Sequence, residues 1–370
     1  MHYLTFVAVD IPPYVEDFEE NKKVEKAIKE LQVDESKDKI MKDIYLECLF
    51  EHKTTFGRLV GDAIEETLAP FGQDSEDYQE FMDMTEELEY DYEKGTDDYF
   101  KTPDGQFKKN FGSVGKHQFI IRDNLVYEVV GKGWKRNELR TKLAKKMKAY
   151  PDYPNKKVYK SYKDYCEKGR FFELDKVFKS YGYYCNPNAV YDWYAIGGRW
   201  FDCLLVKDSC TEVFSCDKKR EDEKPAPEGF KWVAGARMKD IEWDLMLKIK
   251  KDRLIEEYEQ YKKWFADGIL PEKTYCTLRS NGISSWNGME YYDGDTLEVF
   301  MARKGIADGV KYPPVCYGYF HDGMYHEQWY FNPSEKKGGN IEEATWQKEV
   351  DVYLDGLNPD DVLVGVDIHM

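Results

Sequence analysis

The chain has 370 residues, of which 42% are hydrophobic, 16% aromatic and 34% charged, and 71 acidic against 54 basic side chains give a formal net charge of −17. This length fits about two domains or one large one, and the aromatic content argues against intrinsic disorder. A mean hydropathy of −0.73 without a long unbroken apolar run excludes a membrane-spanning helix. The N-terminus lacks the pattern of a signal peptide, so we expect a folded, cytoplasmic protein with no membrane partner.

In the first half of the chain, the pattern predicts one strand followed mainly by helices. Alternating apolar residues predict a strand over 3–10, which two prolines end. Apolar side chains at helical spacing predict helices over 17–31, 40–49 and 56–68. Asp123-Asn124 between 117–122 and 125–130 indicates a β-hairpin, and residues 135–148 have a basic helical pattern.

The second half mixes strands and helices. The predicted helices cover 238–265 and 342–357. The predicted strands cover 201–206, 296–302, 315–320, 324–330 and 361–369. The closing strand repeats a string of the first strand, since Val364–Ile368 matches Val7–Ile11. If both strands lie in one sheet, Asp10 and Asp367 leave them at comparable positions, and strand direction decides whether they share an edge.

These elements predict an α+β fold with an antiparallel or mixed sheet that contains the first and last strands. Helices pack against this sheet, and a helical acidic segment is inserted into it. We expect a core domain of residues 1–13 with 180–370, an acidic helical region at 14–112, and a basic hairpin and helix region at 113–179.

Charge is distributed unevenly along the chain. Residues 62–104 contain 16 acidic and 2 basic side chains, whereas residues 131–170 contain 14 basic and 4 acidic ones. One interpretation is that the two segments attract each other within the molecule. The other is that the acidic segment disfavours binding to duplex DNA and attracts a basic surface of a host protein. The residues of this candidate interaction surface are Glu76, Asp77, Glu80, Asp83, Glu86, Glu87, Glu89, Asp91, Asp97 and Asp98.

The segment 186–200 combines turn residues, aromatic rings and charges. Gly197-Gly198 allows positive φ or close backbone approach, and Arg199 behind it is suited to hold a phosphate or carboxylate. Asp192 is a candidate general base. The candidate ligand-binding residues are Trp193, Tyr194, Gly197, Gly198, Arg199 and Trp200. The alternative is a structural role, with the tryptophans in the core and Asp192 paired with Arg199.

The closing strand supplies a second candidate site. Asp367 and His369 lie two residues apart and therefore on one strand face, where they can form an acid–base pair or ligate a metal. A frayed terminus is the alternative for His369. With Asp192 they are the candidate catalytic residues. Only six histidines are present, and no phosphate-binding loop, dinucleotide-binding glycine pattern or hydrolase motif occurs, so we expect no metal and no cofactor.

The eight cysteines form no C-x-x-C pair, and the cluster at Cys203, Cys210 and Cys216 lacks zinc-knuckle spacing. In a long chain without a signal peptide, we expect them to be free, mostly buried thiols.

The string N-P-N-A-V-Y-D-W-Y-A-I-G-G-R-W at 186–200 resembles the segment N-P-x-A-x-W-D-W-Y-x-x-G-G-R-W of an uncharacterised family of phage and mobile-element proteins. Residues 236–243 resemble its A-R-x-K-D-I-x-W element. The chain departs from the family at Tyr191, where a tryptophan is usual. The resemblance covers mostly residues 183–370 and the first strand.

The ending at 361–370 is similar to the D-D-x-L-x-V-V-D-C-H-I terminus of the same family, with Asp367 and His369 at matching positions. Ile368 stands where the family has cysteine. The resemblance implies a phage or mobile-element setting and no particular reaction.

Two hypotheses of function follow. The first is a non-enzymatic phage-type protein whose acidic surface binds and inhibits a host protein, such as a defence or nucleic-acid-binding protein. The second is a small-ligand or nucleotide-binding protein, or a hydrolase, in which Asp192, Arg199, Asp367 and His369 converge in one pocket with tryptophan walls. The acidic segment favours the first hypothesis, and the motif at 186–200 favours the second.

Overall fold

The computed structural model describes the chain except at residues 1, 35–41, 43–44, 47–48, 50–51, 111–117, 124, 130–145, 216–224, 273, 286–287, 307, 314–315, 333–336 and 341–342. The chain forms two compact units. The first unit consists of Met1–Ser75 and Asn188–Met370, and the second unit of Glu76–Pro187. The predicted α+β fold is confirmed, since a mixed sheet contains the first and last strands. The three-part division predicted from composition stays a prediction.

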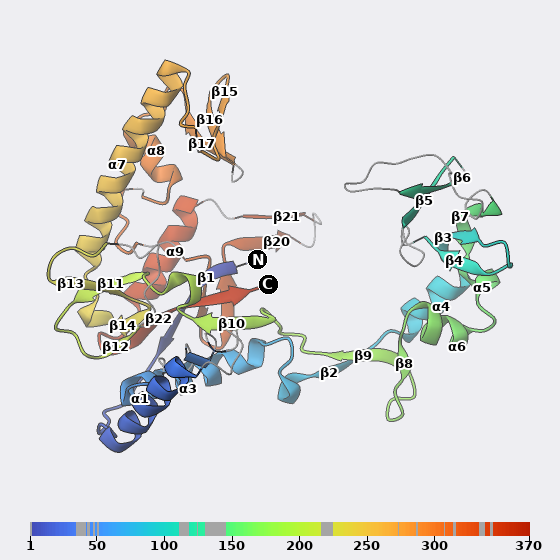
Figure 1. Cartoon of the computed structure of the whole chain (residues 1–370), viewed down its shortest axis with the longest axis horizontal. Helices are drawn as coiled ribbons and strands as arrows, with labels where there is room; N and C mark the ends of the chain where they lie inside the picture. The colour runs from blue at the N-terminus through green and yellow to red at the C-terminus, as the bar shows by residue number, and fades with distance from the viewer. Residues whose placement is uncertain are drawn as a thin grey trace. The chain divides into compact units, whose positions relative to one another are not determined.

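The first unit is built on one central sheet. Its strand order is β12 (Val213–Phe214), β14 (Gly235–Arg237), β22 (Val362–His369), β1 (His2–Val9), β18 (Gly318–His321) and β19 (Met324–Glu327), and β10 (Trp193–Ile196) also pairs with β22. β1 is antiparallel to β22 and parallel to β18. The start of β1 therefore lies beside the end of β22 (Figure 1). This direction places Asp10 and Asp367 toward opposite ends of the pair.

Both faces of this sheet are buried, and alternate side chains of β1 and β22 enter different cores. Leu4, Phe6 and Leu363 join the first core, to which Met246 of α7 and Trp346 of α9 belong. Alternate residues of the same strands join the second core: Val7, Val9, Val362, Val364, Val366 and Ile368. The bounds of the two helices are Trp243–Asp267 for α7 and Glu343–Asp355 for α9.

Four predicted helices are confirmed, as α1 (Phe18–Val33), α3 (Thr55–Leu68), α7 and α9. In α3 the apolar residues Phe56, Val60, Ile64 and Leu68 recur every fourth position and pack into the second core. Thr54 caps this helix by accepting the Gly57 N–H at 3.0 Å. The helix predicted over 40–49 falls mostly on residues outside those described.

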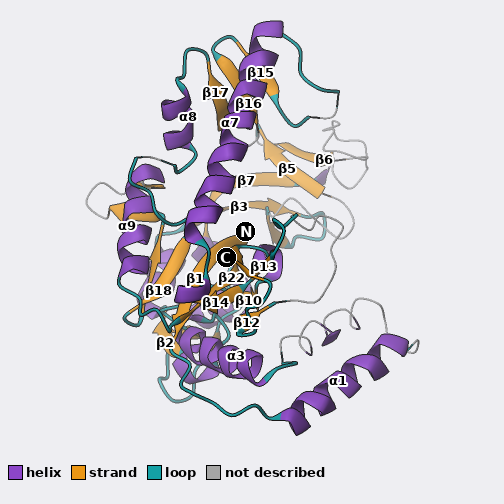
Figure 2. Cartoon of the chain, turned by 90° about the vertical axis from the view of Figure 1, so that its left-hand side faces the viewer, coloured by secondary structure: helices purple, strands orange, loops and turns teal. Residues whose placement is uncertain are grey.

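The far end of α7 carries a separate small core (Figure 2). It is formed with β15 (Thr277–Arg279), β16 (Gly282–Ser285), β17 (Gly288–Tyr292) and α8 (Leu297–Arg303). The strand predicted over 296–302 is wrong, because this segment is the helix α8. Thr296 accepts the Val299 N–H at 3.3 Å as an N-cap, and Phe300 is buried in the small core. This cap and tertiary packing outweigh the β propensity of Val299 and Phe300.

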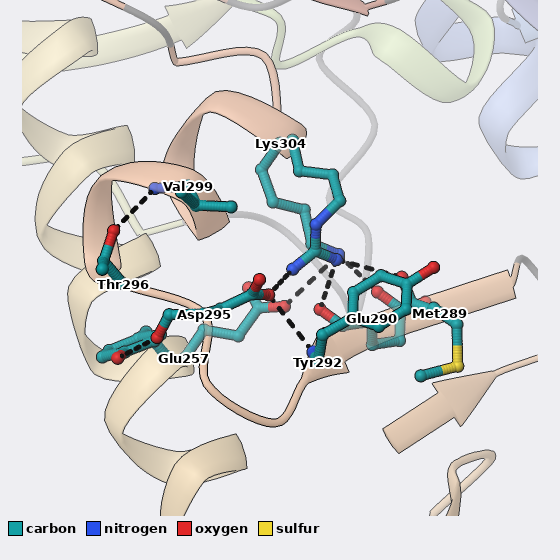
Figure 3. Close-up of polar contacts among 10 residues, drawn as sticks. Glu257, Met289, Glu290, Tyr292, Asp295, Thr296, Val299 and Lys304 are labelled. Atoms are coloured by element: carbon teal, nitrogen blue, oxygen red, sulfur yellow. Dashed lines mark hydrogen bonds and ion pairs between the residues drawn. The ribbon is translucent and has the colours of Figure 1, made fainter. Parts of the chain in front are cut away.

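An ionic network ties α8 to the β17 turn (Figure 3). Lys304 pairs with Glu290 and lies 3.8 Å from Glu257 of α7, while Arg303 pairs with Asp295. The arginine also donates to the carbonyl oxygen of Met289 at 3.3 Å. These contacts join the helix, the hairpin and α7.

Short elements complete the first unit. They are the pairs β11 (Leu204–Lys207) with β13 (Phe230–Val233) and β20 (Trp329–Asn332) with β21 (Lys337–Asn340), and the 3-10 turns η1 (Ala69–Phe71), η5 (Gly198–Trp200) and η6 (Met238–Asp240). β11 corresponds to the strand predicted over 201–206. β18 and β19 correspond to the strands predicted over 315–320 and 324–330.

The second unit consists of short strands and helices. Its strands are β2 (Glu80–Asp83), β3 (Thr96–Lys101), β4 (Phe107–Lys109), β5 (Gln118–Arg122), β6 (Leu125–Val129), β7 (Lys148–Pro154), β8 (Glu173–Leu174) and β9 (Tyr181–Cys185). Its helices and helical turns are η2 (Glu76–Tyr78), α4 (Thr85–Glu93), α5 (Asn155–Val158), α6 (Tyr162–Asp164) and the π-type η4 (Tyr165–Gly169). The predicted hairpin is confirmed as the antiparallel pair β5–β6. The basic helix predicted over 135–148 falls largely on residues 130–145, outside those described.

Two small aromatic cores hold the second unit together. One contains Leu88, Tyr165 and Tyr181, and the other contains Phe100 and Phe119. Within the described part of both units, no helix is long and apolar enough to cross a membrane. The cysteines in the described ranges are free thiols.

Candidate functional site

Three neighbouring strands bring a tryptophan and two histidines into one row. In the registers of β10, β22 and β1, Trp193 lies opposite His369, which lies opposite His2. Directly paired residues share a sheet face, so the three rings gather. The His2 ring centroid is 5.1 Å from that of His369 and 5.2 Å from that of Trp193, and Trp193 stacks on His369 at 5.6 Å. Because His2 alternates with Leu4, this row lies on the sheet face that α7 covers.

The first Asp–His pair is buried at its carboxylate. Asp367 is 2% exposed, and its Oδ1 lies 3.1 Å from Nδ1 of His2. Its Oδ2 accepts the backbone N–H of Arg199 at 3.2 Å. Such donors are what a buried carboxylate requires. Because a carboxylate accepts hydrogen bonds, Nδ1 of His2 is the donor and Nε2 is the ring nitrogen left for a ligand.

The second Asp–His pair is more exposed. Nδ1 of His369 lies 2.7 Å from Oδ1 of Asp192, and the two side chains are 32% and 43% exposed. The hydrogen bond from His369 holds the pKa of Asp192 below its usual range. The alternative in which Asp192 pairs with Arg199 is wrong, because Asp192 pairs with His369. The Arg199 side chain is exposed, and its backbone N–H rather than its guanidinium reaches the site.

The two glycines of the motif allow the chain to pass directly over Asp367. Gly197 and Gly198 have φ of +72° and +49°, which other residues rarely adopt. A Cβ on Gly198 would lie 2.5 Å from the Cβ of Asp367. Gly197 also donates its N–H to the carbonyl of Gly365 on β22 at 2.8 Å. The sequence Gly197-Gly198 therefore serves both predicted purposes, positive φ and close approach.

A cavity of about 540 Å³ is lined in part by His2. Its aromatic walls are formed by Trp200, Trp232 and Tyr317. One face of α7 contributes the cationic side chains Lys250 and Arg253. The cavity thus combines flat apolar surfaces with two cations and one carboxylate, that of Asp202, and it adjoins the Asp–His pairs through His2.

Two thiols, those of Cys203 and Cys316, also line this cavity. Burial raises the pKa of the Cys316 thiol, so this residue contributes apolar surface rather than a nucleophilic thiolate. Among the described residues, no group of three histidine, cysteine or acidic side chains is arranged to hold a metal ion.

Six of the predicted site residues separate into three groups. Asp192, Trp193, Asp367 and His369 are brought together around His2, and Trp200 lines the cavity. Tyr194 points to the opposite sheet face, where its ring lies 5.4 Å from that of Tyr191.

Sequence reasoning missed His2. The repeated Val-x-Val-Asp-Ile string did indicate that the first and last strands share a sheet. An antiparallel pairing of the two chain ends would have placed His2 opposite His369, but neither direction nor register was readable.

The ten acidic residues proposed as an interaction surface all belong to the second unit. Eight are exposed, whereas Asp91 and Asp97 are half-buried. Asp91 pairs with Arg170 and Asp97 pairs with Lys109, each at 2.6 Å. Both side chains are therefore neutralised within their own unit, and of these two pairs only the one with Arg170 joins the acidic segment to the basic segment 131–170.

No protein-family model, curated protein or solved structure matches this chain.

Proposed function

We propose that the first unit binds a small anionic ligand of the nucleotide class in the cavity beside His2. The observation that carries this proposal is the combination of aromatic walls, Trp200 and Trp232, with the cations Lys250 and Arg253 in one cavity. A nucleobase stacks on aromatic faces, and phosphate oxygens attract lysine and arginine.

Size and charge also support a small ligand. The cavity volume of about 540 Å³ lies within the range of roughly 300–1,000 Å³ that is usual for small-molecule sites. The net charge of −17 disfavours long polyanions, whereas a mononucleotide or dinucleotide meets mainly the local field of the cavity.

Titration calorimetry with nucleosides, mononucleotides and dinucleotides tests this proposal. We expect phosphate-bearing ligands to bind more tightly than the matching nucleosides, with affinity that decreases as salt increases. Trp232→Ala and Arg253→Gln should weaken binding, because they remove a stacking surface and a cation.

Lys251→Gln is the matched control, since Lys251 is exposed on the same helix but does not line the cavity. Equal losses in Arg253→Gln and Lys251→Gln would indicate a general charge effect. Absence of binding across the whole set of ligands would refute the proposal.

A second candidate function concerns the second unit and is supported by its exposed acidic residues. Here the acidic surface binds a basic host protein and inhibits it, in the phage or mobile-element setting that the family resemblance implies. Glu86 and Glu87 are adjacent and exposed on α4, while Leu88 anchors this helix in a core. A surface of one charge sign steers and selects partners of the opposite sign.

Affinity capture from host cells tests this second function. The double charge reversal Glu86→Lys/Glu87→Lys should abolish capture of a basic partner at moderate salt. The matched control is Glu65→Lys/Glu66→Lys, an adjacent exposed pair on α3 of the first unit. Capture that survives both the α4 reversal and high salt would contradict a role of the acidic surface.

A further inference from the structure

The two histidines of the site are held in the same way. Each donates Nδ1–H to an aspartate, His2 to Asp367 and His369 to Asp192, and the ring centroids are 5.1 Å apart. Each aspartate fixes its imidazole in one orientation and one tautomer, with Nε2 as the second nitrogen. Trp193 stacks on one ring and meets the other edge-on, which restricts both further.

Two imidazoles side by side can move protons in opposite directions. A neutral imidazole takes a proton from an attacking hydroxyl group, while an imidazolium gives one to a leaving oxygen. Such a pair supplies no nucleophile by proton transfer alone. It therefore suits a substrate that carries its own hydroxyl next to the bond that breaks, as a ribonucleotide does through its 2′-hydroxyl.

We propose that His2 and His369 form an acid–base pair that cleaves the phosphodiester bond of a short ribonucleotide held in the adjacent cavity. This inference rests on the proposed function, because it requires a nucleotide bound beside His2. His2 connects the two sites, since it lines the cavity and also belongs to the histidine pair.

The step is balanced without any further reactant. The 2′-oxygen forms a bond to phosphorus as one Nε2 removes its proton, and the bond from phosphorus to the 5′-oxygen breaks as the other Nε2 donates a proton to that oxygen. The products are a 2′,3′-cyclic phosphate and a free 5′-hydroxyl. Proton exchange with water then restores both imidazoles.

The test uses the full-length chain with the dinucleotides ApA and UpU and their 2′-deoxy counterparts. We expect at least one ribodinucleotide to be cleaved to the cyclic phosphate, detected by ³¹P NMR. The 2′-deoxy counterpart should bind but stay intact, because it lacks the attacking hydroxyl. His2→Asn and His369→Asn should each lower the cleavage rate roughly 100-fold or more, as expected for loss of a general acid or base.

His321→Asn is the matched control, because His321 is also close to an aspartate, with Nε2 3.5 Å from Oδ2 of Asp322, yet lies outside the site. Unchanged affinity for the 2′-deoxy dinucleotide shows that a variant is folded. If His2→Asn loses that affinity, the cleavage rate of His369→Asn tests the acid–base pair instead, because His369 is the more exposed of the two histidines.

The two proposals fail in different ways. Ribodinucleotides that bind but stay intact would overturn the acid–base pair and leave the proposed binding function standing. Absence of binding by every dinucleotide, with mononucleotides still bound, would overturn the acid–base pair alone, whereas absence of binding by mononucleotides as well would overturn the binding function. Cleavage at the wild-type rate in a folded His369→Asn variant would also overturn the pair.

Discussion

Gly198 is the position where a single methyl group tests the geometry of the site. Alanine at this position adopts a positive φ of +49°, which costs about 1 kcal/mol. Its Cβ would also lie 2.5 Å from Cβ and 2.9 Å from Oδ2 of Asp367, so one of the two segments has to move. Overpacking of this kind costs about 1–3 kcal/mol. We expect Gly198→Ala to lower the free energy of unfolding by about 3 kcal/mol in total.

Gly268→Ala is the matched control. Gly268 ends α7 with φ of +67°, and a Cβ there meets nothing within 4 Å. In this variant the free energy of unfolding should fall by only about 1 kcal/mol, the cost of placing alanine at a positive φ. The effect of alanine on the unfolded chain is common to both variants and cancels. The difference of about 2 kcal/mol between them therefore measures the contact with Asp367.

Urea unfolding followed by tryptophan fluorescence measures this difference. Eight of the nine tryptophans lie in the first unit, since Trp134 is the exception, so the signal reports mainly on the unit that contains the site. Equal unfolding midpoints and slopes for Gly198→Ala and Gly268→Ala would refute the close approach of the Gly-Gly turn to Asp367.

Two further predictions concern pH. Burial raises the pKa of Glu290, but the contacts led by its ion pair with Lys304 outweigh burial, and the folded-state pKa is lowered. A lowered pKa stabilises the fold above the unfolded value and loses this contribution as pH falls through the folded value. At pH 7, Glu290→Gln should therefore unfold at a lower urea concentration than wild type, with a free energy of unfolding lower by about 1–2 kcal/mol. This difference in free energy should shrink toward pH 3, and a difference that stays constant with pH would contradict the prediction. In the site, His369→Ala removes the hydrogen-bond donor and should raise the pKa of Asp192 toward its ordinary value, as measured by ¹³C NMR of the carboxyl groups, and an unchanged titration would show that His369 does not hold it.

Much of the fold was readable because local patterns and tertiary packing agree. The strands at both chain ends are rich in β-branched residues, and helices such as α3 repeat apolar side chains at helical spacing. The segment at 296–302 was misread because the β-branched and aromatic residues Val299 and Phe300 occur there. Its helical form depends on a cap at Thr296 and on packing against α7, which is distant in sequence.

The site was only partly predictable, because its contacts join three strands that are far apart in the sequence. The shared face of Asp367 and His369 follows from their spacing on one strand. The pairing of Asp192 with His369 and of His2 with Asp367 depends on the registers of β10 and β1 against β22. Register is set by the whole sheet, and no local pattern in this chain encodes it.

With the register known, the motif at 186–200 can be explained residue by residue. Asp192 precedes β10 and holds His369, while Trp193 and Ala195 lie on the same face of β10, opposite His369 and Asp367. The small side chain of Ala195 is followed by the Gly-Gly turn, which brings a backbone N–H to Asp367. The motif therefore covers the closing strand β22. Of its two tryptophans, Trp193 stacks on His369 and Trp200 lines the cavity.

The way in which the second unit is inserted gives a last test that separates the two functions. Its flanking segments are joined to each other within the first unit: Gly72 bridges to Tyr191, and the Val190 N–H donates to the carbonyl of Phe71 at 2.8 Å. The residues on both sides of the insertion are thus already held together by backbone hydrogen bonds. Both Asp–His pairs and the whole cavity lining belong to the first unit.

We therefore expect a chain in which a short Gly/Ser linker replaces residues 76–187 to fold and to keep the proposed nucleotide affinity. Closing a shorter loop costs less chain entropy, so the deletion by itself does not oppose folding of the first unit. The same deletion should abolish capture of a basic partner, since it removes every residue of the acidic surface. Loss of cooperative unfolding in tryptophan fluorescence would contradict the independence of the first unit. Loss of nucleotide binding in a chain that still unfolds cooperatively would assign a role in ligand binding to the second unit.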